Sequence, residues 1–191
     1  MTDHASITAA AERIRNELGR LNVLVNNAGI SHAGKPGRPL PEMAKSGLMS
    51  VVSLDEVRKV WETNVFGVIA VTQAMLPLLR EASAARIVNI SSTGGSLTWN
   101  SDPTNPHRAM FGTYSSSKTA LNAITLAFAS DLESAGIKVN AACPGFTSTD
   151  LNNFAGTRTV EQAAREPVRL ALLGPDGPTG TFSDENGPIP W

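Results

Sequence analysis

Short apolar runs alternate with helical periodicities along the whole chain. Three runs have the length of strands, and a fourth short strand is possible near the C-terminus: LNVLV (21–25), RIVNI (86–90), IKVNAAC (137–143) and TGTFSDE (179–185). Apolar residues at helical spacing predict four helices, over residues 5–18, 54–81, 114–134 and about 160–173. Strands that are apolar along their whole length are typical of a parallel sheet covered by helices on both faces. The pattern therefore predicts an α/β fold.

Capping signals mark several of the predicted helix ends. Asp3 precedes the first helix as a possible N-cap, and Gly19 follows it as a stop. SLDE (53–56) and the pair Thr159 and Gln162 have the spacing of capping boxes. Segments rich in glycine, proline and serine predict two long loops, over 31–52, with room for one short helix, and over 97–112.

Composition narrows the class of protein. The 191 residues are 41% apolar and 17% charged, which favours one globular domain with a sizeable core. The net charge of -1, without a basic stripe, argues against a nucleic-acid partner. No apolar run reaches membrane-spanning length and no signal pattern opens the chain, so we expect a cytoplasmic protein and no membrane partner.

Cysteine and histidine are too sparse for a metal or disulfide site. Cys143 is alone, so no internal disulfide forms, and a reducing compartment fits. We expect Cys143 to be a small buried residue at a strand end, since no histidine lies near it in sequence. His4, His32 and His107 are scattered without ligand spacing, so no metal site is predicted.

Polar or glycine-bearing turns follow all three confident strands. The turns are NNAG, SSTGG and CPG. The carboxyl ends of parallel strands meet at one edge of the sheet, which is where ligands bind in α/β folds. Tyr114 and Lys118 begin the helix after the middle strand's loop, so they can reach the same edge.

Tyr114 and Lys118 are four residues apart, one turn of a helix. An ammonium within ~4–5 Å favours the phenolate by roughly 3–4 kcal/mol at an effective dielectric of ~20. That attraction would lower the tyrosine pKa toward the range of general acid–base catalysis. The alternative is a solvated polar helix face.

Ser92 and Asn64 complete the candidate set. Ser92, at the end of a strand, can hydrogen-bond a substrate carbonyl, or it is simply a turn residue. Asn64 falls on the apolar stripe of the helix over 54–81, where an amide must find partners. It bridges two helices, or it holds a water that relays protons to Lys118.

Five segments together resemble the short-chain dehydrogenase/reductase family over essentially the whole chain. They are NNAG (26–29), TNVFG (63–67), NISS (89–92), YSSSK (114–118) and CPGFTSTD (143–150). The long loops and the ending GPIPW are most similar to the carbonyl-reductase-like branch. The resemblance implies a truncated Rossmann-like doubly wound parallel sheet flanked by helices, with 1–191 as the single C-terminal portion of such a domain.

The resemblance also implies roles for individual residues. Tyr114 would be the acid–base, and Lys118 would lower its pKa and hold the nicotinamide ribose. Ser92 would orient the carbonyl, and Asn64 would position the relay water. The remaining cofactor-binding residues would be Asn26, Asn27, Ala28, Gly29, Pro144, Gly145, Thr147 and Thr149. The implied cofactor is NADPH or NADH, with NADP slightly favoured, and the implied substrate is a small-molecule carbonyl or alcohol.

The chain departs from the family at its start. No T-G-x-x-x-G-x-G turn is present, and about sixty residues that carry this phosphate-binding turn are absent by comparison. We therefore expect weakened cofactor binding and an open edge at the strand 21–25. Two functions follow: an NAD(P)H-dependent oxidoreductase, or a non-catalytic truncated paralogue or fragment that serves as a dimerisation module. A homo-oligomer would form through the helices 54–81 and 114–134.

Overall fold

A mostly parallel five-stranded sheet forms the centre of the computed structural model, which describes residues 1–34 and 37–191. The strand order is β1-β2-β3-β4-β5; the first four strands are parallel and β5 is antiparallel to β4. The strands are β1 (Val23–Asn26), β2 (Arg86–Ile90), β3 (Lys138–Ala142), β4 (Phe182–Asp184) and β5 (Gly187–Pro188). The predicted α/β fold is confirmed. The hairpin between β4 and β5 was not predicted from the sequence.

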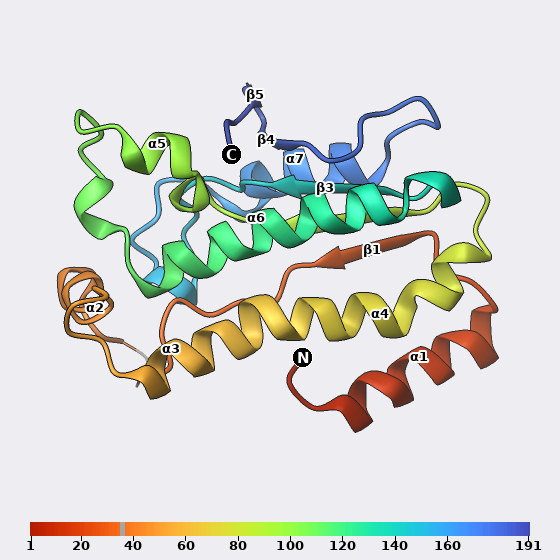
Figure 1. Cartoon of the computed structure of the whole chain (residues 1–191), viewed down its shortest axis with the longest axis horizontal. Coiled ribbons are helices and arrows are strands. Elements are labelled where there is room, and N and C mark those ends of the chain that lie inside the picture. The colour runs from red at the N-terminus through yellow and green to blue at the C-terminus, as the bar shows by residue number, and fades with distance from the viewer. Residues whose placement is uncertain (35–36) are drawn as a thin grey trace.

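Helices cover both faces of the sheet (Figure 1). In the view of Figure 1, α4 and α6 lie in front of the strands and α7 lies behind them, while α1 packs against α4. The α-helices are α1 (His4–Leu18), α2 (Leu40–Ser46), α3 (Leu54–Trp61), α4 (Gly67–Arg80), α5 (Leu97–Ser101), α6 (Thr113–Asp131) and α7 (Val160–Ala171). The short helical turns are η1 (Glu62–Phe66), η2 (Thr93–Gly95), η3 (Arg108–Met110), η4 (Glu133–Ala135) and η5 (Asp150–Asn152).

The capping signals hold at three of the four predicted places. Asp3 accepts from the Ala5 N–H at 3.0 Å, and Gly19 closes α1 with a left-handed φ of 73°. The box at the start of α7 forms in both directions. At the start of α3, Ser53 accepts from the Glu56 N–H at 3.2 Å, but the Glu56 carboxylate accepts from the Ala33 N–H at 2.6 Å. The predicted return bond from the Glu56 side chain to the Ser53 N–H is wrong, because the carboxylate accepts from a distant backbone donor instead.

The two predicted loops contain more helix than the sequence indicated. The first loop contains α2, which agrees with the single short helix predicted there. Lys35 and Pro36 in the same loop lie outside the described residues. The second contains α5 and η3, which were not predicted. Ser96 makes α5 possible by accepting from the Trp99 N–H at 3.1 Å.

The predicted helix over 54–81 runs from Leu54 to Arg80, but it is interrupted by the π-helical turn η1. Single π turns inside α-helices are frequent at functional sites, and this one carries Asn64. By length and composition alone the 27-residue helix could cross a membrane, yet 44% of its most apolar stretch is buried inside the protein. Core helices of globular proteins meet the same criterion.

The main apolar core lies between the sheet and the layer formed by α1, α4 and α6. Its fully buried members come from α4, β2, β3 and the end of α6, and they include Leu78, Leu79, Ile87, Leu132, Ile137 and Val139. The strand β1 pairs only with β2 within the described residues, and Val25 is 42% exposed there. The predicted open edge at the first strand is thus present in this chain.

A line of buried polar side chains crosses the sheet and joins it to two helices. The Asn26 amide in β1 donates to Thr72 Oγ1 in α4 at 3.1 Å and to Asn89 Oδ1 in β2 at 2.8 Å. The Asn89 amide then donates to Thr125 Oγ1 in α6 at 2.9 Å. Each of the four residues is at most 4% exposed. Removing one member leaves the others without partners in a region that water does not reach.

We expect Asn89→Ala to lower the free energy of unfolding by about 1–3 kcal/mol, because Thr125 loses its donor and Asn26 loses an acceptor. Urea denaturation measures the change. Asn16→Ala, on the exposed face of α1, is the control and should change the same quantity by less than about 0.5 kcal/mol. Equal stability of the two variants would contradict this account of the polar line.

Candidate active site

The predicted site residues lie around the carboxyl ends of the parallel strands. In Figure 1 the strand β1 points toward the end of the molecule where α6 begins. Ser92 follows β2, Pro144 follows β3, and the turn at 26–29 follows β1. Because the strands are parallel and adjacent, these three turns share one edge of the sheet, as predicted.

Tyr114 and Lys118 face each other on the first turns of α6. The Lys118 Nζ lies 5.7 Å from the centre of the Tyr114 ring. The ammonium donates to the Ile90 carbonyl, at the end of β2, at 2.7 Å. Lys118 is only 4% exposed, whereas Tyr114 is half-buried. The pair is therefore turned toward the sheet edge and is no solvated polar face.

The pKa values at this pair differ from the sequence-based expectation. Burial raises the pKa of Tyr114 to about 12, nearby Cys143 raises it further, and a hydrogen bond with Ser92 opposes both. Burial also lowers the pKa of Lys118 to about 8. The predicted lowering of the tyrosine pKa by the lysine is therefore wrong for the chain by itself. Helical spacing brings the two groups close together, but desolvation dominates the pKa of both.

Ser92 is both a turn residue and a neighbour of Tyr114. Its Oγ accepts from the Gly94 N–H at 3.1 Å, which caps η2, and its hydroxyl is near enough to Tyr114 to lower the pKa of the phenol. Cys143 supports the same turn, because its Sγ accepts from the Thr93 N–H at 3.2 Å. Cys143 is buried as predicted, and burial raises the pKa of its thiol.

Asn64 fastens the loop after β1 to the helix that carries Tyr114. Its amide nitrogen donates to the Ile30 carbonyl at 2.8 Å and to Ser117 Oγ at 3.0 Å, and its Oδ1 accepts from the Ile30 N–H at 2.8 Å. Ser117 Oγ in turn donates to the Tyr114 carbonyl at 2.6 Å. Both N–H groups of the amide therefore have protein acceptors.

Ser117 is the bridging residue that the sequence reasoning missed. The signal was its place inside YSSSK, directly before Lys118, where it shares a helix face with Tyr114. Of the first predicted cofactor-binding turn, Asn26 has its amide committed to the buried polar line, while Asn27 and Ala28 are exposed. Gly29 is so close to the site that a Cβ there would lie 3.5 Å from Lys118 Nζ.

The segment after β3 curls back on itself. Gly145 has a left-handed φ of 74°, and a Cβ there would lie 2.5 Å from the Arg158 side chain. Thr147 donates to the carbonyls of Pro144 and Gly145 at 3.3 and 3.2 Å, so its hydroxyl is engaged within its own loop. Thr149 directly precedes η5.

The arrangement fits the nicotinamide half of a dinucleotide. The Lys118 ammonium has three donors, of which the described residues use one, and it is otherwise buried next to Tyr114 and Gly29. A buried ammonium with spare donors suits the hydroxyls of a ribose. The sequence contains no glycine-rich turn for the pyrophosphate. Over residues 1–34 and 37–191, no group of three His, Cys, Asp or Glu could hold a metal ion.

Comparison with known proteins agrees with this fold. The profile of the short chain dehydrogenase family matches residues 1–159. Short-chain dehydrogenase anuI of Penicillium roqueforti is 38% identical over 174 residues, which cover 88% of this chain and 64% of that protein. The (-)-isopiperitenone reductase of Mentha piperita is 31% identical, over 95% of this chain and 76% of that protein.

Solved structures of reductases have a similar fold. The NADPH-bound carbonyl reductase from chicken fatty liver superposes with a TM-score of 0.79 at 30% identity, over all of this chain and 74% of that chain. Salutaridine reductase from Papaver somniferum gives a TM-score of 0.75 at 27% identity, over 95% of this chain and 79% of that chain.

The fold defines an α/β protein of the Rossmann-like class. The chain belongs to the short-chain dehydrogenase/reductase family. The predicted family and the predicted type of enzyme are thereby confirmed. The chain spans between about two thirds and three quarters of the length of these relatives, with 64% at the lower end.

Because Tyr114 is the single tyrosine of the chain, its ionisation is directly observable as phenolate absorbance. We expect Tyr114 to stay almost fully protonated at about pH 10, where a free phenol is half ionised. The pKa of Tyr114 is higher in the folded chain than in the unfolded chain. The contribution of this group to the free energy of unfolding is therefore fully present below about pH 10 and is lost as the pH rises toward about 12.

The titration is followed together with far-ultraviolet circular dichroism, which confirms that the chain is still folded at each pH. Tyr114→Phe should abolish the absorbance change. Ser92→Ala should move the midpoint upward, since it removes the hydrogen bond that lowers the pKa. A midpoint at or below the ordinary value in the folded chain would show that desolvation does not dominate the site.

Proposed function

We propose that this chain carries the catalytic part of an NAD(P)H-dependent oxidoreductase that interconverts a carbonyl and an alcohol, with Tyr114 as the acid–base. The observation that supports it most is the convergence of the Tyr114 hydroxyl, the Ser92 hydroxyl and the Lys118 ammonium at the end of β2. Membership in the short-chain dehydrogenase family and the reductase and dehydrogenase names of the relatives support the same reaction class.

The protonated phenol is the form that carbonyl reduction requires. Burial keeps the pKa of Tyr114 well above neutrality, so its hydroxyl carries a proton that can pass to a carbonyl oxygen. Ser92, whose hydroxyl lowers the pKa of Tyr114, would donate to the same oxygen and orient it. The Lys118 ammonium would favour the phenolate that remains after the proton has left, because opposite charges at this range attract.

Bound NADPH or NADH would supply the hydride. Lys118 would hold the nicotinamide ribose, and the turn at 26–29 would form the wall beside the cofactor. Pro144, Gly145, Thr147 and Thr149 would contribute backbone and side-chain contacts on the opposite side. Four further points remain predictions. They are the preference for NADP, the relay water at Asn64, the cytoplasmic location, and pairing through α3, α4 and α6.

Cofactor binding separates this proposal from its alternative, a non-catalytic dimerisation module. The 191-residue chain is titrated with NADPH and with NADH, and nicotinamide fluorescence is recorded. Saturable binding is expected, weakened relative to a site with a complete phosphate-binding turn. No binding up to millimolar cofactor, together with a defined oligomer in solution, would favour the interaction module instead.

Tyr114→Phe should lower turnover of aldehydes or ketones by about 10²–10⁴-fold, because general acid catalysis is lost. Cofactor affinity and the far-ultraviolet spectrum should not change. Ser130→Ala, on the exposed side of the same helix, is the matched control that removes one hydroxyl far from the site. Turnover by Tyr114→Phe equal to that of the parent chain would refute the assignment of the acid–base.

A further inference from the structure

The helix that carries Tyr114 begins without a cap of its own. Its N-cap residue is Gly112, which has no side chain to accept from the first turn. A carbonyl from another element stands nearby: the Gly47 oxygen accepts from the Thr113 N–H at 2.9 Å and from Thr113 Oγ1 at 3.0 Å. Thr113 is only 2% exposed, so water does not compete for these bonds. Gly47 therefore satisfies donors that the helix start leaves open.

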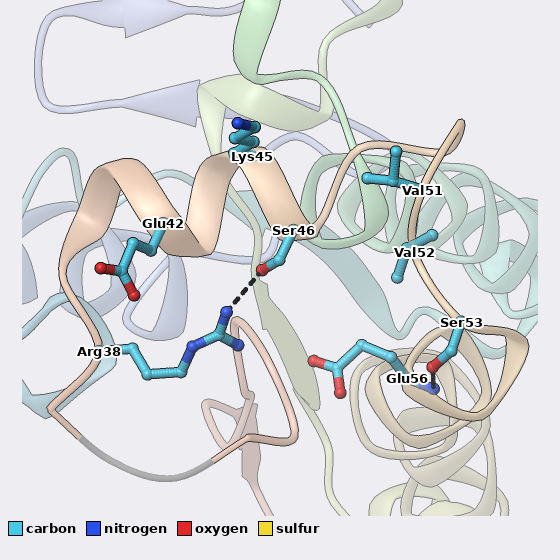
Figure 2. A pocket seen from close by; sticks show the side chains of 8 residues that line it. All are labelled: Arg38, Glu42, Lys45, Ser46, Val51, Val52, Ser53 and Glu56. Atoms are coloured by element: carbon cyan, nitrogen blue, oxygen red, sulfur yellow. Dashed lines mark hydrogen bonds between the residues drawn. The ribbon is translucent and has the colours of Figure 1, made fainter.

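Gly47 is the residue that ends α2, and α2 is thinly packed. No side chain of this helix is buried. A pocket of about 600 Å³ lies beside it, lined by Arg38 and by residues of α2, the segment 51–53 and the start of α3 (Figure 2). Figure 2 shows the Arg38 guanidinium reaching Ser46, the last residue of α2, at 3.0 Å. Polar contacts near its ends, more than an apolar core, hold α2 in place.

The contact between α2 and α6 is made at backbone distance. A Cβ on Gly112 would lie 2.4 Å from the Gly47 oxygen and 2.9 Å from its carbonyl carbon. These are backbone atoms, so a side chain at position 112 forces the two elements apart. Thr113 and Tyr114 follow at once in the chain, and any separation here moves the first turn of α6.

We propose that Gly47 positions Tyr114, and that Gly112 and Thr113 are the positioning residues through which the end of α2 sets the tyrosine against Ser92. This inference rests on the proposed function, which makes Tyr114 the acid–base. Lys118 lies one turn further along α6 and is also tied to β2 through the Ile90 carbonyl. Ser92 lies two residues beyond the end of β2. Tyr114 is thus the member of the site that lies next to the contact with Gly47, while its carbonyl is held separately by Ser117.

Three variants and a control test the contact. Thr113→Val removes the side-chain bond to Gly47, Thr113→Ser keeps it, and Gly112→Ala pushes Gly47 away. Gly174→Ala is the matched glycine control, since a Cβ there would meet no atom within 4 Å. For each variant, kcat and the KM for cofactor are measured, and the ionisation of the single tyrosine is followed by absorbance.

We expect Thr113→Val and Gly112→Ala to lower kcat by about 10- to 100-fold, as a misplaced catalytic group does, while the cofactor KM changes by less than about twofold. The ionisation midpoint of Tyr114 should fall from about 12 toward its ordinary value of 10.0, because the loosened first turn admits water. Thr113→Ser and Gly174→Ala should retain the kcat and the midpoint of the parent chain.

A purely structural contact gives a different result. If Thr113→Val lowers the melting temperature while kcat and the tyrosine midpoint stay unchanged, the proposal is overturned. If the parent chain itself has no turnover, the proposed function fails, but the tyrosine midpoint still decides this inference. Should Gly112→Ala not fold, the comparison of Thr113→Val with Thr113→Ser carries the test alone.

Discussion

Buried amide groups that must be hydrogen-bonded fix the geometry of this chain. The Asn26 and Asn89 amides join β1 and β2 to α4 and α6, and Asn140 joins β3 to the segment before β4 through Thr181. Asn64 applies the same constraint at the site, because its amide is used on both sides by the loop after β1 and by Ser117. An unpaired amide in these places costs a few kcal/mol, so the strand ends and the start of α6 are held in one arrangement.

The same exclusion of water sets the chemistry of the site. Desolvation raises the pKa of Tyr114 and lowers that of Lys118, so both groups are biased toward their neutral forms. Because the Tyr114 phenol stays protonated, it forms no ion pair with Lys118 in the resting chain, even though the lysine Nζ lies over the tyrosine ring. A phenol held protonated at neutral pH can give up its proton only when a stronger acceptor or a compensating charge enters, which is a sensible resting state for a proton donor.

Local sequence signals were enough for the strands, most helix ends and the sheet edge that carries the site. Apolar runs, the caps at Asp3 and Gly19, and the turns after the strands depend on near neighbours in the chain. The failures depend on distant partners. Glu56 leaves its capping box for Ala33, and burial reverses the expected pKa shift of Tyr114. Helical spacing reports which side chains are close, but it carries no information on the dielectric around them.

The three residues of the proposed site are held in place to different degrees. Ser92 follows a fully hydrogen-bonded central strand, and Lys118 is anchored to the last carbonyl of the same strand, so both inherit the rigidity of the sheet. Tyr114 stands on the first turn of α6, where Thr113 donates its N–H and its hydroxyl to Gly47, at the end of a helix with no buried side chain. The position of the proposed proton donor is consequently linked to the loop over 31–52. If Gly47 positions the phenol as proposed, a change at the end of α2 moves Tyr114 before it moves Ser92 or Lys118.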